Sequence, residues 1–268
     1  MRLDAAIAAR GLARSRTQAA QQITDGLVRV NGVGVVKPSI QVTDDAVITV
    51  AGADHYVSRG AHKLLAALDA FDVECHGRLC LDLGASTGGF TQVLRERGAC
   101  RVIAVDVGHG QLAAAVSADP GVTSVEGVNA RHLTPDALAV SAGTAQAPGV
   151  VTGDLSFISL TLVLPAIAAV AASDADIVLL VKPQFEVGRT GVREGLVTDP
   201  AARADAVAGV LWAAWDAGLG TFGVIASPIV GTHGNSEFLV HLRPVAPAEA
   251  RGNPTQWLSE VDTVTGAR

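Results

Sequence analysis

The amino-acid sequence predicts an α/β fold with a seven-stranded, mostly parallel sheet, preceded by a small α+β domain. From residue 59 onwards, short apolar segments alternate with helical patterns, which is typical of a parallel sheet. The first fifty residues contain instead two short helical patterns and a hairpin signal. A length of 268 residues suffices for one large and one small domain. We therefore expect a small domain over 1–50, a linker over 51–58 and a large domain over 59–268.

The small domain is predicted to begin with a helix over 3–9. Ser15, with a glutamine three positions later, forms a capping-box pattern that predicts a second helix over 15–24. Asn31-Gly32 lies between two valine-containing runs and is the strongest short signal for a hairpin. Further short strands are expected after the hairpin, the last of them over 46–50.

Four short runs of this domain carry a resemblance to a known family. They are Arg2-Leu3-Asp4, Gly11-Leu12-Ala13-Arg14-Ser15-Arg16, Gly26-Leu27-Val28-Arg29-Val30-Asn31-Gly32 and Lys37-Pro38-Ser39. In this order they resemble an S4 domain, which implies binding to structured RNA through the helix pair and the loop around Lys37. On the residues alone, arginines at a helix start can share a phosphate with free backbone N–H groups, and a solvated surface is the alternative. We expect one track of phosphate contacts from six cations: Arg2, Arg14, Arg16, Lys37, Arg59 and Arg131.

Charge is distributed unevenly along the chain. Residues 1–50 hold six of the 20 lysines and arginines but only four of the 26 aspartates and glutamates. The net charge of the whole chain is −6, which argues against a general nucleic-acid binder. We therefore expect RNA contacts at the positive end and no DNA partner.

The linker contains Tyr56, the only tyrosine of the chain. An aromatic residue in a hinge usually packs on one of the domains that it connects. Stacking on RNA is the alternative.

A glycine-rich run follows the first strand of the large domain. The strand is predicted at 78–81, the run reads LDLGASTGGFT over 81–91, and a helical pattern over 92–98 follows. A strand that passes through glycines into a helix start lets a ligand approach the bare backbone. The run differs from the dinucleotide-binding G-x-G-x-x-G pattern, and a tight turn without a ligand is the alternative.

The next strand, predicted at 101–105, ends at Asp106, whose carboxylate could accept hydrogen bonds from both hydroxyls of a ribose. A glycine loop after one strand and an acid after the next resemble the class I S-adenosylmethionine-dependent methyltransferases. The resemblance implies S-adenosylmethionine as cofactor, with its amino-acid end over the loop and its ribose by Asp106. The residues expected to hold it are Asp82, Gly84, Ala85, Ser86, Thr87, Gly88, Asp106, Val107, Asn129 and Asp154.

The remaining elements continue the alternation. The predicted strands are 123–125, 150–152, 176–181, 222–225 and 237–242, and the predicted helices are 59–71, 160–172 and 201–217. No helical pattern separates the last two strands, which predicts an antiparallel pair. The tail from Pro244 has no readable pattern apart from Trp257, which could dock it on the domain.

Four polar residues fall at or near the carboxyl ends of these strands, where ligand sites in such sheets lie. They are Lys63, Asp154, Lys182 and Glu237. Separately, each could be an ion pair at a strand end. Together, in this order, they resemble the Lys-Asp-Lys-Glu set of the RNA ribose 2′-O-methyltransferases. A ribose hydroxyl is a weak acid, so an amine must stabilise the alkoxide or take the proton, while carboxylates hold the amines.

The chain has 17 arginines but only three lysines, and two of the three are Lys63 and Lys182. Arginine stays protonated, whereas a lysine beside another cation can be pushed toward neutrality. We expect Lys182 to lie closest to the 2′-hydroxyl, with Lys63 beside it. Phe157 is a candidate to stack on a target base, with a core phenylalanine as the alternative.

Four longer runs extend the resemblance over nearly the whole chain. They are Ser58-Arg59-Gly60-Ala61-His62-Lys63, Gly84-Ala85-Ser86-Thr87-Gly88-Gly89-Phe90, Asp154-Leu155-Ser156-Phe157-Ile158-Ser159-Leu160 and Lys182-Pro183-Gln184-Phe185-Glu186-Val187-Gly188. With the S4 runs, they are similar to the TlyA family. The resemblance implies a cytoplasmic enzyme that methylates the 2′-hydroxyl of cytidine in ribosomal RNA, on the large subunit and in some members also the small one. It also implies an effect on susceptibility to ribosome-binding cyclic-peptide antibiotics. We expect a monomer.

Three other functions remain open. Asp154-Leu155-Ser156-Phe157 stands where RNA base methyltransferases carry a D/N-P-P-Y/F motif, but the prolines are absent. Family members have been called haemolysins, yet the apolar runs stop short of a membrane span and no signal-peptide segment is present. A non-catalytic RNA-binding module is the third, and the intact cofactor loop argues against it. The three cysteines lack metal-ligand spacing, so we expect reduced thiols and no metal site.

Overall fold

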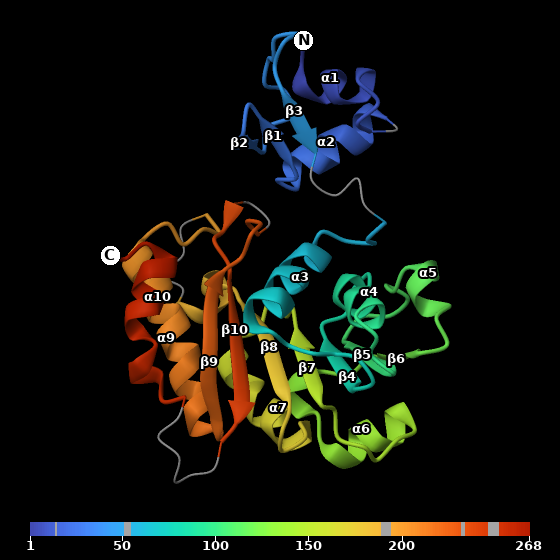
Figure 1. Ribbon diagram of the computed structural model, residues 1–268, viewed down its shortest axis with the longest axis vertical. Coiled ribbons are helices and arrows are strands. Elements are labelled where there is room, and N and C mark those ends of the chain that lie inside the picture. Colours follow the sequence, from blue (N-terminus) through green and yellow to red (C-terminus); the bar gives the residue numbers. More distant parts are fainter. Residues whose placement is uncertain (14, 51–54, 189–193, 232–233, 246–251) are drawn as a thin grey trace.

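The computed structural model describes residues 1–13, 15–50, 55–188, 194–231, 234–245 and 252–268, and these contain two separate sheets (Figure 1). Helices α1 (Leu3–Ala9) and α2 (Arg16–Thr24) pack on a small antiparallel sheet. Its spatial order is β2 (Val33–Val35), β1 (Val28–Val30) and β3 (Ile48–Val50).

The helix cap and the hairpin turn predicted for the small domain are both present in the structure. The Ser15 side chain caps α2 by accepting a hydrogen bond from the backbone nitrogen of Gln18 at 3.1 Å. Asn31 and Gly32 have φ values of 51° and 82°, as the predicted hairpin turn requires. The further strands expected after the hairpin reduce to β3 and a single bridge between Arg2 and Gln41.

The large sheet has seven strands, and its order and directions confirm the predicted fold class. In spatial order they are β6 (Val122–Glu126), β5 (Arg101–Asp106), β4 (Leu79–Leu83), β7 (Val150–Gly153), β8 (Asp176–Val181), β10 (Phe238–Pro244) and β9 (Leu219–Ala226). Strand β10 runs antiparallel to both neighbours, and the other pairs are parallel. The predicted antiparallel pair at the end of the chain is therefore confirmed.

Both faces of the sheet are covered by helices. Helices α3 (Gly60–Phe71) and α4 (Gly89–Glu96) lie on one face, and α6 (Pro135–Ala142), α7 (Leu164–Val170), α9 (Pro200–Asp216) and α10 (Leu258–Thr265) lie on the other. Short helices α5 (Ala114–Ser117) and α8 (Pro183–Glu186) follow β5 and β8. Alternate residues of β4 serve opposite faces, since Leu81 and Leu83 join the α7 side and Cys80 the α3 side.

Three local predictions need correction. The helix expected over 160–172 is a 3-10 turn (Leu160–Leu162) followed by α7, which has Pro165 in its first turn and ends at Val170. Helix α4 begins at Gly89, three residues before the predicted start, because Gly88 turns the chain with a φ of 95°. The tail contains α10, which the sequence did not signal, and Trp257 packs beside it against the core.

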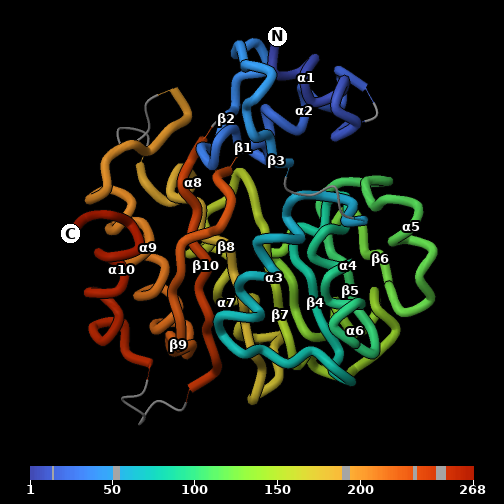
Figure 2. The backbone as a smooth tube through the Cα atoms, turned by 45° about the horizontal axis from the view of Figure 1, so that its top comes forward, coloured from blue at the N-terminus to red at the C-terminus, as the bar shows by residue number. Residues whose placement is uncertain are grey.

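The carboxyl ends of the parallel strands face the small domain, as the direction of β9 and the position of the blue segment show (Figures 1 and 2). Arg59, at the start of α3, donates a hydrogen bond to the backbone oxygen of Asp25 at the end of α2. Tyr56 packs on the α3 face of the large domain, with its ring centroid 5.7 Å from that of His62. The expected packing of the linker aromatic on one domain is confirmed.

Among the helices that the structure describes, none combines the length and apolar character that crossing a membrane requires.

Candidate active site

The glycine loop after β4 forms the floor of the site. Gly84 has a φ of 78°, a conformation that favours glycine. A Cβ atom at Gly84 would lie 2.9 Å from the backbone oxygen of Asp154, so the loop and the segment after β7 are in close contact. On the other side, the backbone nitrogen of Ser86 donates a hydrogen bond to Asp106 Oδ2 at 2.8 Å. The loop is therefore held against both neighbouring strand ends.

A cavity of about 830 Å³ lies between this loop, the end of β5 and the segment after β7. Asp106 stands on its wall, and its second oxygen accepts a hydrogen bond from the backbone nitrogen of Gly108 at 2.8 Å. Each carboxylate oxygen retains a further lone pair for a ligand hydroxyl. Val107, which is exposed, adds an apolar surface next to the acid.

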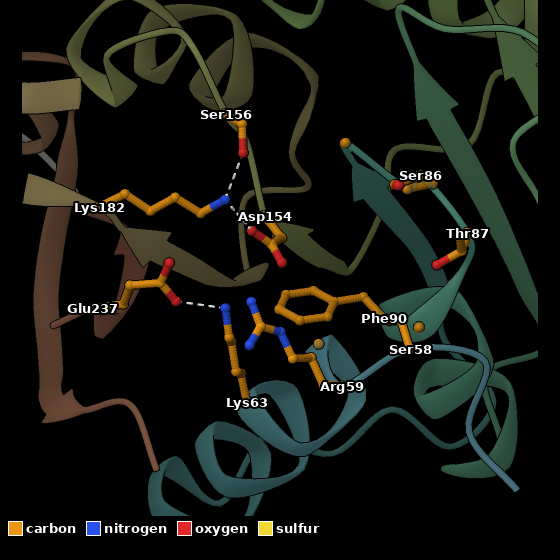
Figure 3. A pocket seen from close by; sticks show the side chains of 14 residues that line it. Ser58, Arg59, Lys63, Ser86, Thr87, Phe90, Asp154, Ser156, Lys182 and Glu237 are labelled. Atoms are coloured by element: carbon orange, nitrogen blue, oxygen red, sulfur yellow. Dashed lines mark hydrogen bonds and ion pairs between the residues drawn. The ribbon is translucent and has the colours of Figure 1, made fainter. Parts of the chain in front are cut away.

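A second cavity of about 250 Å³ holds the four residues of the Lys-Asp-Lys-Glu set (Figure 3). Lys63 Nζ lies 2.5 Å from Glu237 Oε2, and Lys182 Nζ lies 2.6 Å from Asp154 Oδ1. Two ammonium groups thus face two carboxylates. Arg59 also lines this cavity, so its local charge is positive.

The topology of the sheet explains why these four meet. Asp154 and Lys182 directly follow the parallel strands β7 and β8, while Lys63 projects from the first turns of α3. Glu237 directly precedes β10, and because β10 is antiparallel, its beginning lies at the same edge as the ends of β7 and β8. Lys63, Lys182 and Glu237 are buried, with 5%, 8% and 4% of their surface exposed. Such buried charges require partners, which the two ion pairs supply.

The two cavities share part of their walls. Gly84, Ser86, Asp154 and Ser156 line both. A ligand in the larger cavity and a ligand in the smaller one would therefore meet at the end of β7. This arrangement suits a reaction between two bound molecules.

The segment after β7 is fixed by a buried acid. Glu186, on α8, accepts hydrogen bonds from the Ser159 hydroxyl at 2.5 Å and from the backbone nitrogen of Leu160 at 2.9 Å. Burial raises the pKa of the Glu186 carboxyl, and the two donors oppose that rise. The loop that carries Asp154 and Ser156 is thereby tied to the helix that follows Lys182.

Most of the expected cofactor residues line one of the two cavities. Gly84, Ser86, Asp106, Val107, Asn129 and Asp154 line the larger one, while Ala85 and Thr87 line the smaller. Asp82 and Gly88 line neither. The Asp82 carboxylate is fully buried beneath the loop, where it accepts hydrogen bonds from Thr91 at 2.6 Å and Thr152 at 3.0 Å. Direct contact between Asp82 and a ligand, as expected from the sequence, has no support in this geometry.

The cations expected to contact RNA lie on both domains. Arg2 and Arg16 both pair with Asp4, each at 3.1 Å, and hydrogen bonding to Arg2 is the main reason that the pKa of Asp4 is lowered to about 2. Lys37 is exposed on the small domain, and Arg131 is exposed at the rim of the larger cavity. Arg14 lies outside the described residues. With Arg59 at the smaller cavity, the expected cations of the large domain flank the site.

Phe157 is not a core residue, because 91% of its surface is exposed. Its φ of 64° is rare for a residue with a large side chain and turns the ring outward at the mouth of the larger cavity. The ring centroid lies 5.3 Å from that of Phe185. The alternative of a core phenylalanine is therefore wrong, while stacking on a base stays a prediction.

Two serines of the site had no role in the sequence interpretation. Ser58 lines the smaller cavity, and Ser156 lines both and accepts a hydrogen bond from Lys182 Nζ at 2.7 Å. Both stand inside runs that carried the family resemblance, but a serine in a loop has no spacing pattern that marks it as functional. Among the described residues, no group of three or more His, Cys, Asp or Glu side chains could hold a metal ion.

Comparisons with known proteins agree with this geometry. Residues 56–244 match the family model described as FtsJ-like methyltransferase, and residues 1–48 match the S4 domain. A relative from Mycobacterium tuberculosis, named 16S/23S rRNA (cytidine-2'-O)-methyltransferase TlyA, is 51% identical over 245 residues, which cover 90% of this chain and 89% of the relative.

Two further relatives carry haemolysin names. Hemolysin A of Brachyspira hyodysenteriae is 36% identical over 242 residues, which cover 90% of this chain and 99% of the relative. A solved Streptococcus thermophilus structure with a hemolysin name has a TM-score of 0.76 at 36% identity, covering 100% of this chain and 96% of its own. Relatives that match nearly the whole chain therefore carry both kinds of name.

Proposed function

The chain belongs to the FtsJ-like methyltransferase family, and on that premise we propose that it transfers a methyl group from S-adenosylmethionine to the 2′-hydroxyl of a cytidine in ribosomal RNA. We assign residues 1–50 to RNA docking, 51–58 to the linker and 59–268 to catalysis. The substrate is ribosomal RNA within the ribosomal subunits of the cytoplasm, where the enzyme acts as a monomer.

One observation carries this proposal: the two lysine–carboxylate pairs lie in a cavity that shares a wall with the larger cavity beside Asp106. Ribose methylation needs a buried amine near a weakly acidic hydroxyl and a methyl donor alongside. A base methyltransferase acting on an exocyclic nitrogen has no use for two buried lysines. The relatives' haemolysin names have no counterpart in a feature of this site.

The larger cavity suits S-adenosylmethionine in size and chemistry. Asp106 supplies a carboxylate for ribose hydroxyls, Asn129 an amide, and Val107 an apolar surface for the adenine. Ser86 and Asp154, on the wall shared with the smaller cavity, would hold its methionine end. When bound, the cofactor supplies an electrophilic methyl group on a sulfonium. Asp82 acts indirectly, by fixing the base of the glycine loop through Thr91 and Thr152.

In the smaller cavity, Lys182 is the group that takes the proton of the 2′-hydroxyl or stabilises the negative charge of the alkoxide. Lys63 places a second positive charge beside it, and Glu237 holds Lys63 in position. Asp154 holds Lys182 and orients the hydroxyl. Phe157 stacks on the target base after that base leaves its helix.

RNA docking follows from the position of the small domain over the same edge of the sheet (Figure 2). The expected contacts come from Arg2, Arg14, Arg16 and Lys37, continued by Arg59 and Arg131 at the two cavities. Such a track would lead a structured RNA from the S4 domain to the site of transfer.

Transfer of labelled methyl groups to purified 50S and 30S subunits, followed by nucleoside analysis, tests the proposed function. We expect labelled 2′-O-methylcytidine in 23S RNA, with 16S RNA as a second substrate. Label on a cytosine base would favour the exocyclic-amine alternative, and absence of label from both subunits would refute the proposal. Because the modified nucleotides belong to the ribosome, loss of the enzyme should also change susceptibility to cyclic-peptide antibiotics.

A further inference from the structure

Among the described residues, one group accepts an aligned hydrogen bond from the Lys182 ammonium. It is not Asp154, the carboxylate of the Lys-Asp-Lys-Glu set beside it. Asp154 Oδ1 lies 2.6 Å away but is not aligned to accept a hydrogen bond from Nζ. The aligned acceptor is the Ser156 hydroxyl at 2.7 Å (Figure 3). Lys182 Nζ is therefore held between the charge of Asp154 and the hydroxyl of Ser156, which is its aligned acceptor.

Ser156 lies between Lys182 and the open part of the site. Only 8% of Lys182 is exposed, whereas Ser156 is an exposed residue. Ser156 also lines both cavities, so its hydroxyl borders the space where the two ligands meet. The bonds that Glu186 makes to Ser159 and Leu160 keep this exposed segment in place.

We propose that Ser156 is a further catalytic residue, whose hydroxyl contacts the target 2′-hydroxyl and relays its proton to Lys182. The inference rests on the proposed ribose methylation. A hydroxyl can accept one proton while it gives up another, which neither a carboxylate nor an ammonium can do in the same step.

The proton balance of the relay is simple. Before transfer, the Lys182 ammonium gives one proton to solvent, and the Ser156 hydroxyl, which accepts a hydrogen bond from that ammonium in the structure, then donates to the lone pair of Nζ. The 2′-O–H bond breaks and its proton bonds to Ser156 Oγ, while the original serine proton moves to that lone pair. The electron pair left on the 2′-oxygen is the pair that bonds to the incoming methyl carbon. Ser156 ends as a hydroxyl and Lys182 as an ammonium beside Asp154, so only the lysine must later release a proton to solvent.

Replacement of Ser156 by threonine and by valine tests the relay, because these two side chains share a shape and branching and differ in the hydroxyl. Single-turnover methylation of 50S subunits should be at least about 30-fold slower in Ser156→Val, as expected for loss of a proton-transfer group. Ser156→Thr should recover most of the rate. Calorimetric affinity for S-adenosylmethionine and the melting temperature should be alike in the two variants. Ser141→Ala, on the exposed surface of α6, controls for loss of a serine elsewhere.

Rates measured in mixtures of H₂O and D₂O separate a relay from mere positioning. We expect a curved dependence on deuterium fraction in the wild type and Ser156→Thr, because two protons move, and a linear one in Ser156→Val. Equal rates in the threonine and valine variants, or a linear dependence in the wild type, would overturn the relay. Failure of the wild type to form 2′-O-methylcytidine would instead refute the proposed function itself.

Discussion

Lys182 and Asp82 are both buried, but the surrounding groups give them different tasks. Lys182 has an ion-pair partner and a hydroxyl partner and lines a cavity, whereas the Asp82 carboxylate accepts hydrogen bonds from Thr91 and Thr152 beneath the loop. Lysine could be singled out from the sequence because it is rare in an arginine-rich chain. The burial of Asp82 could not be predicted from the sequence, because it depends on threonines of α4 and β7 that pack against it.

Replacing Lys182 by arginine should nearly abolish methyl transfer. Arginine keeps the positive charge, but it does not give up its proton, and its planar group is too large for a nitrogen held between Asp154 and Ser156. We expect the single-turnover rates of Lys182→Arg and Lys182→Ala to be within about tenfold of each other and at least about 100-fold below wild type. Cofactor and subunit binding should be preserved in both. Transfer by Lys182→Arg within about threefold of wild type would show that only charge is needed.

Asp82 should make stability depend on pH. Burial raises its pKa from 3.8 to about 6 in the folded protein, although Thr91 and Thr152 oppose the rise. The folded state therefore binds the proton more tightly, and its relative stability is greatest below pH 4 and falls as pH rises to about 6. The shift corresponds to about 3 kcal/mol in the free energy of unfolding.

Asp82→Asn removes this titration while keeping a side chain that can bond to both hydroxyls. Chemical denaturation of the variant and the wild type between pH 4 and pH 7 measures the difference in unfolding free energy. We expect the variant to become relatively more stable as pH rises, since only the wild type loses the contribution of Asp82 in this window. Parallel curves for the two proteins would show that Asp82 does not titrate there.

At the scale of elements, the sequence was most informative where local chemistry decides. The cap at Ser15, the Asn31-Gly32 turn and the strands of the parallel sheet follow from neighbouring residues. The sequence did not indicate that the helix expected over 160–172 is interrupted at Val163, nor that α10 exists. Packing against the core decides both features. The same reason hid Ser156, whose hydrogen-bond partner is a lysine that follows a different strand.

The contact between the glycine loop and the segment after β7 leads to a prediction for Gly84. A side chain there would strain the backbone at a φ of 78° and meet the Asp154 backbone oxygen at 2.9 Å. Gly84→Val should therefore displace the wall shared by the two cavities and abolish calorimetric binding of S-adenosylmethionine, while circular dichroism shows an intact fold. Gly110→Val is a matched control, because Gly110 also has a positive φ but no atom within 4 Å of a Cβ. Unchanged cofactor affinity in Gly84→Val would contradict the assignment of the loop.

At the scale of the whole molecule, the S4 domain and the FtsJ-like methyltransferase domain are two units of one chain. The small domain lies over the carboxyl edge of the large sheet (Figure 2). Arg59 connects the two domains by donating a hydrogen bond to the carbonyl of Asp25. Arg2 and Arg16 share one acid, Asp4, which stays ionised because its pKa is low. This pairing orders two arginine side chains and leaves the group with a net positive charge, as the proposed RNA contact requires.

Replacing Arg2, Arg14, Arg16 and Lys37 together by alanine should weaken binding to ribosomal subunits and reduce its dependence on salt. Each lost phosphate contact lowers the slope of log K against log salt by about 0.7 to 0.9, so the four should lower it by about three. Arg97→Ala with Arg268→Ala is the control, because both side chains belong to exposed ion pairs of the large domain. Calorimetric affinity for free S-adenosylmethionine should stay at the wild-type value, since the three of them that the structure describes, Arg2, Arg16 and Lys37, line neither cavity. A quadruple variant with the salt slope of the wild type would place the RNA on another face of the molecule, and the cations around Arg59 and Arg131 would then have to bind it without the small domain.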